Sequence, residues 1–300
     1  MCGICGIILK DHDNPNFSIG ALLYRMMESQ QVRAQDSAGI AIFNNGDARC
    51  NDLSYNLNYF IKSPPTTSMT TTVTGRYELI EEKIPASKPI KEQSLLVSKL
   101  SKDDSVSIIG YSNKMKLVKN MGLVKDLDKK YNIRSMKGSH GIGHLRIATS
   151  SKVDLGNAHP FSTTVLPDIA VVHNGEITNY SKLRNLLEIK GYPFYSSCDS
   201  EVIAVFLADQ LLMHGDIQRA HDQFIQKADG PFTYFAATPH SLSLVRDKFG
   251  TRKGIIGYNR GGEGNPAFWA MATDLSALDI VGANEDVKAA SPGKSIIFTI

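Results

Sequence analysis

The chain lacks three features that would assign it to a common class of protein. It has no uninterrupted apolar run that approaches the ~20 residues of a membrane span. Its N-terminus has no basic stretch followed by an apolar core, so we expect no secretory signal peptide. The formal net charge is only +3, with no dense stripe of lysine and arginine, which argues against nucleic-acid binding. We therefore expect a cytoplasmic protein that binds neither membrane nor nucleic acid.

Cysteine is also scarce, with four residues among 300: Cys2, Cys5, Cys50 and Cys198. So few cysteines fit a reducing compartment. The pair Cys2-Gly-Ile-Cys5 has the spacing of a redox or zinc motif, but no second pair or nearby histidines follow. Residues 3–10 are typical of a strand, on which positions three apart face opposite sides, so we expect Cys5 to be a buried apolar residue. Without a cysteine cluster or a dinucleotide fingerprint, we expect no cofactor in this chain.

What remains is an ordinary globular composition, 42% hydrophobic and 21% charged, enough for one large or two small domains. Apolar spacing predicts helices over 18–30, 123–131, 179–190, 199–213 and 216–228. Alternating and apolar runs predict strands over 3–10, 39–43, 106–111, 141–148, 169–172, 232–238, 242–246, 268–273 and 295–300. The polar stretch at about 50–138 predicts an insertion or subdomain. Strands interleaved with pairs of helices indicate sheets covered by helices.

The most informative residue is Cys2, which only Met1 precedes. Initiator methionine is normally removed before a small residue, so we expect a mature chain that begins at Cys2. That residue then carries both a thiol and a free α-amine, whose reference pKa values are about 8.5 and 8. An N-terminal nucleophile can use its own amine as general base. The alternative is that this cysteine has no chemical role.

A strand that contains Gly143-His-Leu-Arg-Ile-Ala-Thr149 would place His144, Arg146 and Ala148 on one face. The guanidinium of Arg146 offers a planar, bidentate grip on a carboxylate, although an ordinary salt bridge at the end of a strand would use the same residue.

The segment Val172-His-Asn-Gly-Glu176 is usually only a tight turn after an apolar strand. It also supplies two hydrogen-bond donors. Asn174 has a side-chain amide, and Gly175 allows a backbone N–H to approach a substrate closely. Two such donors can form an oxyanion hole.

The segment Ser196-Ser-Cys-Asp-Ser-Glu201 precedes an apolar helix, where serine and aspartate are ordinarily caps. Asp199 could also receive a substrate ammonium group. Cys198 is a second candidate nucleophile, but nothing beside it resembles a base. A polar turn at 33–39, Arg-Ala-Gln-Asp-Ser-Ala-Gly, says little alone.

Taken together and in this order, Cys2-Gly-Ile, the turn at 33–39, Gly143–Thr149, His173-Asn-Gly-Glu-Ile and Asp199-Ser-Glu resemble the class II glutamine amidotransferases. The resemblance covers nearly the whole chain, 2–300, and implies an α+β fold, a four-layer α-β-β-α sandwich of the N-terminal-nucleophile hydrolase type. It implies Cys2 as nucleophile, Asn174 and Gly175 as the oxyanion hole, and Arg146, Thr149 and Asp199 as the residues that bind glutamine. The sequence departs from the family pattern at Ala34, where glycine is usual, and lacks the histidine or tryptophan that some branches carry in the Arg146 motif.

Members of this family normally fuse the glutaminase domain to one that uses ammonia. No ATP loop, phosphoribosyl-pyrophosphate motif or sugar-isomerase region is recognisable here. Residues 149–161 look most like the glutaminase portion of glutamate synthase. The resemblance thus implies a glutaminase subunit that delivers ammonia to a separate synthase subunit, with flavin and iron–sulfur centres in that partner and 2-oxoglutarate as acceptor. Three alternatives stay open: the glutaminase subunit of an N-methylglutamate synthase, an amide hydrolase with another substrate, and a non-catalytic regulatory subunit of the same fold.

Overall fold

The structure is a computed structural model of the chain. The residues that it describes are 2–10, 17–44, 55–62, 67–68, 71–72, 77–84, 96–147, 154–262 and 265–300.

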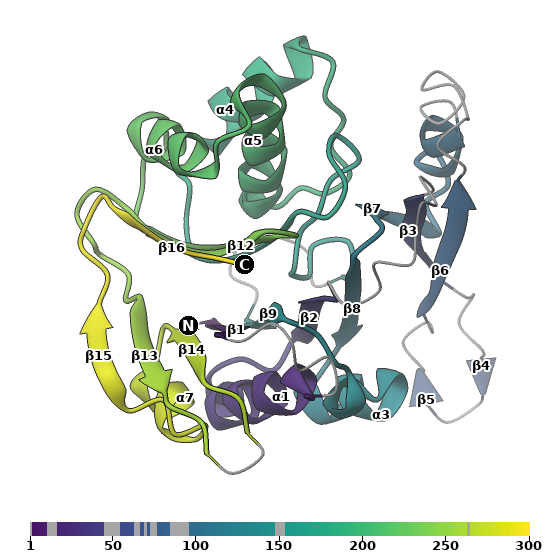
Figure 1. Cartoon of the computed structure of the whole chain (residues 1–300). Helices are drawn as coiled ribbons and strands as arrows, with labels where there is room; N and C mark the ends of the chain where they lie inside the picture. The colour runs from purple at the N-terminus through teal and green to yellow at the C-terminus, as the bar shows by residue number, and fades with distance from the viewer. Residues whose placement is uncertain are drawn as a thin grey trace.

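Two antiparallel sheets face each other at the centre of the molecule (Figure 1). The larger one has the strand order β15-β13-β14-β1-β9-β2-β8. Its strands are β1 (Gly3–Leu9), β2 (Ser37–Phe43), β8 (Met115–Met121), β9 (His140–Arg146), β13 (Ile255–Asn259), β14 (Phe268–Ala272) and β15 (Glu285–Ala289). The smaller sheet has the order β10-β11-β12-β16, formed by β10 (Ala170–Gly175), β11 (Phe232–Thr238), β12 (Ser241–Arg246) and β16 (Ser295–Thr299).

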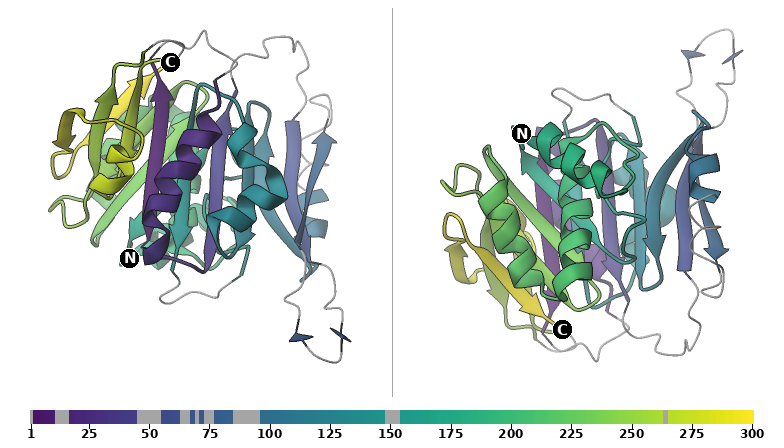
Figure 2. Two further views of the ribbon diagram at one scale, coloured as in Figure 1. Left: turned by 90° about the horizontal axis from the view of Figure 1, so that it is seen from below. Right: turned by 90° about the horizontal axis from the view of Figure 1, so that it is seen from above.

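Helices cover the outer face of each sheet, as Figures 1 and 2 show from three directions. The larger sheet is covered by α1 (Ile19–Gln30), α3 (Val124–Tyr131) and α7 (Leu275–Asp279), and short 3-10 turns follow α1 at Gln31–Arg33 and α3 at Ile133–Ser135. The smaller sheet is covered by α4 (Tyr180–Ile189), α5 (Asp199–His214) and α6 (Ile217–Lys227). The expected four-layer α-β-β-α sandwich is therefore confirmed.

The alternation of side chains along each strand explains the layers. On β1, Cys5 and Ile7 are fully buried against α1, whereas Ile4 and Ile8 are buried between the two sheets. On β9, Leu145 belongs to the helix side and Ile142 to the space between the sheets. Each of these two strands thus contributes to two hydrophobic cores, and both of its faces carry apolar residues. Cys5 is the buried apolar residue that we expected.

A third sheet stands beside the sandwich and has the order β6-β3-β7. It comprises β3 (Tyr55–Lys62), β6 (Tyr77–Ile84) and β7 (Val106–Ser112), and it has its own small core around Leu57, Tyr59 and Tyr111. Two strands of two residues, β4 (Thr67–Ser68) and β5 (Thr71–Thr72), pair with each other. Two elements of the stretch 50–138 belong to the sandwich, because β8 pairs with β2 along its full length and α3 packs into the main core. An insertion or subdomain at about 50–138 stays a prediction.

The expected helices are confirmed to within two residues at each end, and Ser18 caps α1 by accepting from the Ala21 N–H. Two boundaries needed correction. The turn expected at 33–39 ends earlier, because residues 37–39 already belong to β2. The strand expected at 169–172 continues to Gly175, so Asn174 and Gly175 finish β10 rather than form a separate turn. The patterns of β3, β6, β8, β13, β15 and α7 were not recognised in the sequence.

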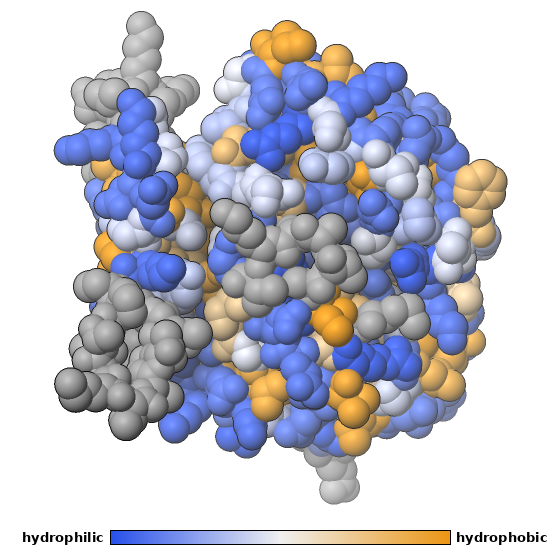
Figure 3. All heavy atoms as spheres, turned by 180° about the vertical axis from the view of Figure 1, so that it is seen from behind, coloured by the Kyte–Doolittle hydropathy of each residue, from blue (hydrophilic) through white to orange (hydrophobic). Residues whose placement is uncertain are grey.

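The surface has no large apolar face in the view of Figure 3, where hydrophobic side chains are scattered among hydrophilic ones. None of the helices among the described residues is long and apolar enough to cross a membrane.

Candidate active site

Strand pairing places Cys2 beside the Arg146 motif. Cys2 precedes β1, and the next residue, Gly3, pairs with Leu145 of β9. The Cys2 thiol is half-buried and donates to the backbone carbonyl of Ile147, at 3.7 Å between sulfur and oxygen. The candidate nucleophile therefore lies at the end of the larger sheet, next to the residue expected to bind a carboxylate.

Asn174 reaches Cys2 from the facing sheet. On β10, Ala170 and Val172 point into the space between the sheets, and Asn174 follows them at the same two-residue spacing. Its side-chain Nδ2 donates to the backbone carbonyl of Cys2 at 3.0 Å. An amide NH2 has two donors, so this bond orients the group and leaves its second hydrogen for another acceptor.

Gly175 occupies a position that no other residue fits. Its φ of +139° lies in a region that side chains other than glycine rarely adopt. A Cβ atom there would lie 2.0 Å from the carbonyl oxygen of Pro231 and 2.8 Å from the Cα of Phe232. Gly175 is also exposed, so its backbone is accessible at the end of the strand that carries Asn174.

Arg146 is the last residue of β9 and is 4% exposed. Its carbonyl accepts from the N–H of Asp36 at 3.0 Å, which ties the short turn before β2 to the site. Arg33 of the same turn forms an ion pair with Asp274. Ala34, where we noted a departure from the family pattern, has φ −155° and ψ 119°, an extended backbone that any residue adopts. Alanine is therefore accommodated there without strain.

Asp199 is the first residue of α5, in the helix layer behind the smaller sheet. Its Oδ2 accepts from the Ile177 N–H at 2.9 Å, and its Oδ1 accepts from the Ser200 hydroxyl at 3.2 Å. Its side chain is 19% exposed, so it remains partly accessible. The structure thus joins Cys2 and Asn174 by a direct hydrogen bond and places Arg146 at the end of β9, the strand that pairs with β1 after Cys2. Asp199 is held by Ile177, in the segment that follows β10. Thr149 lies outside the described residues.

The surroundings of the cysteines distinguish them as nucleophiles. Burial raises the pKa of the Cys2 thiol, an effect that its hydrogen bond to Ile147 and the positive charge of Arg146 partly oppose. Burial and the neighbouring Asp199 raise the pKa of Cys198 to about 12. Burial also raises the pKa of Cys5. Cys198 is therefore a poor nucleophile at neutral pH, and Cys2 is the only one of these three that is not fully buried.

Several buried polar residues lie behind the site, and the sequence assigned no role to them. The rings of His144 and His159 stack with centroids 3.9 Å apart. Lys119 donates to the carbonyl of Ala158 at 2.7 Å, and burial lowers its pKa to about 8. The segment that carries His159 rests on β2 at Gly39, where a Cβ would lie 2.2 Å from the His159 carbonyl oxygen. The only signal for these residues was their position next to recognised motifs.

Within the described part of the chain, no group of three or more histidine, cysteine, aspartate or glutamate side chains could hold a metal ion.

Comparisons with known proteins point to one family. Residues 144–278 match the model of a family described as a glutamine amidotransferase domain. A protein of the glutamine amidotransferase family from Methanothermobacter thermautotrophicus is 33% identical, over 100% of both chains. The glutamine amidotransferase-like protein GlxB of Rhizobium meliloti is 31% identical over 85% of each.

Among solved structures, the glutamine phosphoribosylpyrophosphate amidotransferase of Bacillus subtilis shares the fold, with a TM-score of 0.65 at 19% identity. That match covers 99% of this chain and 47% of the B. subtilis chain, so this chain spans about half the length of that enzyme. The family match and the relatives support an amide-hydrolysing enzyme, and the fold is that of the N-terminal-nucleophile hydrolases. The chain belongs to the class II glutamine amidotransferases.

Proposed function

We propose that the chain hydrolyses glutamine to glutamate and ammonia through a γ-glutamyl thioester on Cys2. The observation that carries this proposal is the 3.0 Å hydrogen bond from Asn174 Nδ2 to the Cys2 carbonyl, because it holds an amide donor beside the proposed nucleophile. Removal of Met1 would give Cys2 the free α-amine that serves as its base.

In the first step the α-amine takes the proton of the Cys2 thiol, and the sulfur attacks the side-chain amide carbon of glutamine. The negative charge that develops on the amide oxygen is stabilised by the second Asn174 N–H and by the backbone N–H of Gly175. The C–N bond then breaks as the protonated amine returns its proton to the leaving nitrogen, which departs as ammonia. Water hydrolyses the thioester and yields glutamate and the free thiol.

The pKa of the thiol fits this use of a local base. Because burial raises it, the Cys2 thiol is protonated at neutral pH until the amine removes its proton. The residue is thereby protected from unselective reaction, and attack is coupled to the arrival of a substrate that fills the site.

Two residues that bind the charged groups on the α-carbon of glutamine complete the proposed site. The guanidinium of Arg146 would hold the α-carboxylate in a bidentate pair, and the carboxylate of Asp199 would hold the α-ammonium. Thr149 is a further proposed contact. These groups account for selection of glutamine over simpler amides, because a buried polar partner left unpaired costs binding energy.

We extend the proposal to the fate of the ammonia, which would pass to a separate synthase subunit with flavin and iron–sulfur centres and 2-oxoglutarate as acceptor. The support is the likeness of residues 149–161 to the glutaminase portion of glutamate synthase. The sheet β6-β3-β7 has a core of its own beside the sandwich and carries none of the proposed catalytic residues, so we place the partner contact there.

The test is steady-state hydrolysis of L-glutamine, with asparagine and simple amides as comparison substrates. Glutamine should be preferred, and addition of the co-encoded synthase subunit should increase turnover. Equal rates on all amides would contradict the proposed binding of the α-carbon groups by Arg146 and Asp199. A lack of association with the synthase subunit would contradict the proposed ammonia route.

A further inference from the structure

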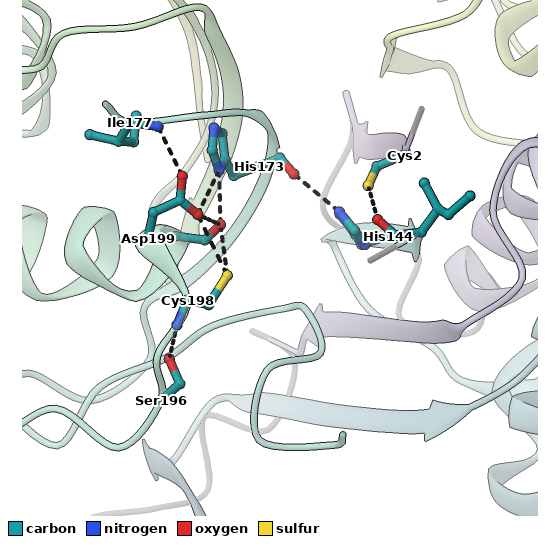
Figure 4. A network of polar contacts seen from close by, with 9 residues as sticks. Cys2, His144, His173, Ile177, Ser196, Cys198 and Asp199 are labelled. Atoms are coloured by element: carbon teal, nitrogen blue, oxygen red, sulfur yellow. Dashed lines mark hydrogen bonds and ion pairs between the residues drawn. The ribbon is translucent and has the colours of Figure 1, made fainter. Parts of the chain in front are cut away.

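A chain of hydrogen bonds crosses three layers of the molecule and ends on Asp199 (Figure 4). His144 of β9 contacts the backbone carbonyl of His173 on β10, at 3.1 Å from Nε2. The ring of His173 lies 2.8 Å from the Ser200 hydroxyl through Nδ1, and that hydroxyl lies 3.2 Å from Asp199 Oδ1. The other carboxylate oxygen accepts from the Ile177 N–H.

The direction of each bond follows from its acceptor. A carbonyl oxygen only accepts, so His144 carries its hydrogen on Nε2. The Asp199 carboxylate accepts from the Ser200 hydroxyl, whose oxygen then accepts from Nδ1–H of His173. The direct separation between His173 Nδ1 and Asp199 Oδ1 is 3.9 Å, too long for a hydrogen bond. Ser200 is therefore the necessary link between the ring and the carboxylate.

Both rings are neutral at neutral pH, so each carries its one hydrogen on the nitrogen that donates. Burial lowers the pKa of His144 to about 3, and it lowers the pKa of His173 against the opposing effect of Asp199. The three linking side chains of His144, His173 and Ser200 are 1%, 3% and 1% exposed. A buried donor that loses its partner destabilises the protein, so the network holds its members in one arrangement.

His173 occupies the centre of this network. Its carbonyl is held by the strand that ends in Arg146, its chain neighbour is Asn174, and its ring orients Asp199 through Ser200. We infer that His173 is a positioning residue. It sets the distances between Asp199, which would bind the α-ammonium, Arg146, which would bind the α-carboxylate, and the oxyanion donor Asn174. This inference rests on the proposed function, since it takes Asp199 and Arg146 as the residues that hold the α-carbon groups.

The network predicts an effect on one part of the ligand only. L-glutamate carries the α-ammonium group, and glutarate is the same molecule without it, so the ratio of their affinities measures the contact at Asp199. Ser200→Ala and His173→Ala should each weaken L-glutamate binding about tenfold, as expected for the loss of a hydrogen bond to a charged group. The affinity for glutarate should change less than twofold in both variants. Asp199→Asn should lower the ratio of L-glutamate to glutarate affinity by at least as much as Ser200→Ala and His173→Ala do.

Two matched variants separate positioning from stability. His140 lies on the same strand as His144 and makes an equivalent bond between the sheets, from Nε2 to the carbonyl of Thr238 at 2.8 Å. His140→Ala should lower the melting temperature like His173→Ala and leave the affinity ratio unchanged. His173→Asn keeps a donor near the place of Nδ1 and should restore most of the ratio.

Calorimetric titration of both ligands into the wild type and these variants, with hydrolysis of glutamine measured in parallel, tests the inference. A wild-type ratio near one, an equal loss of both ligands in Ser200→Ala and His173→Ala, or the same loss of ratio in His140→Ala would overturn it. If the wild type shows the predicted ratios but does not hydrolyse glutamine, the proposed function fails and the positioning role stands. In active enzyme, we expect Ser200→Ala to raise KM for glutamine more than it lowers kcat.

Discussion

Asn174 donates a 3.0 Å hydrogen bond to the carbonyl of Cys2, although 172 positions separate the two residues in the chain. The bond joins the two facing sheets at the end that holds the proposed site, because Cys2 directly precedes the strand β1 and Asn174 nearly ends β10. The proposed nucleophile and the proposed oxyanion donor thus come from different layers, and the sandwich itself fixes their separation.

Asn174→Ala should lower kcat about 100- to 1,000-fold with little change in KM, because an oxyanion donor acts mainly when charge develops on the amide oxygen. Steady-state kinetics with glutamine measure both constants. The control is Asn179→Ala, which removes an exposed amide that donates to the carbonyl of Lys227 at 2.8 Å. A rise in KM without a fall in kcat would assign Asn174 to ground-state binding instead.

Gly175→Ala should be far more damaging than a similar change at another glycine with positive φ. The new Cβ would lie 2.0 Å from the Pro231 oxygen, so the backbone beside Asn174 must shift. Gly215, with φ +65° and nothing within 4 Å, is the control, and alanine there should cost about 1–2 kcal/mol of stability with activity retained. Thermal unfolding and glutamine hydrolysis of both variants measure the difference. Equal effects on activity would argue against a specific need for glycine at position 175.

Arg146→Lys should raise KM for glutamine about tenfold or more, since an ammonium group cannot reproduce the bidentate fork to a carboxylate. Kinetic titration with glutamine tests this. Arg260→Lys serves as control, because Arg260 forms a surface ion pair with Glu285. It follows the end of β13 that lies level with Leu9, at the opposite end of β1 from Cys2. An unchanged KM in Arg146→Lys would remove the residue from the site.

Alkylation of Cys2 by a small neutral reagent should have a midpoint at higher pH than an ordinary thiol. Burial raises the pKa of the thiol, so at a given pH less thiolate is present and the reaction is slower. Glutamine hydrolysis should instead be substantial near neutral pH, because the α-amine removes the proton within the complex. Peptide mapping of iodoacetamide-treated enzyme across pH isolates Cys2, and a midpoint below the ordinary thiol value would contradict the role of burial.

The layer architecture was predictable because its signals are local. The apolar spacing of residues 18–30 indicated α1, and the continuous apolar run at 232–238 indicated β11. The strands that escaped prediction have mixed patterns. β8, Met-Lys-Leu-Val-Lys-Asn-Met, carries the buried Lys119 between Val118 and Asn120. This mixture of lysine, asparagine and apolar residues does not show the pattern of a strand of the main sheet.

The proposed site was predictable as a set of residue types but not as a network. The motifs indicated Cys2, Asn174 and Asp199, because each of these residues supplies a group that glutamine hydrolysis needs. Nothing in the sequence indicated that His173 and Ser200 connect two of these motifs, since that connection depends on α5 packing against β10. Cys198 was an open candidate that the structure disfavours, because burial and Asp199 raise its pKa.

The central claim is that Cys2, freed of Met1, is the nucleophile. The most direct measurement is intact mass and peptide mapping of active enzyme after treatment with a glutamine-like alkylating agent. The account predicts a chain that begins at Cys2, one equivalent of label on that residue, complete loss of hydrolysis, and no labelling of Cys2→Ala. Label on Cys198, or full activity in a chain that retains Met1, would contradict it.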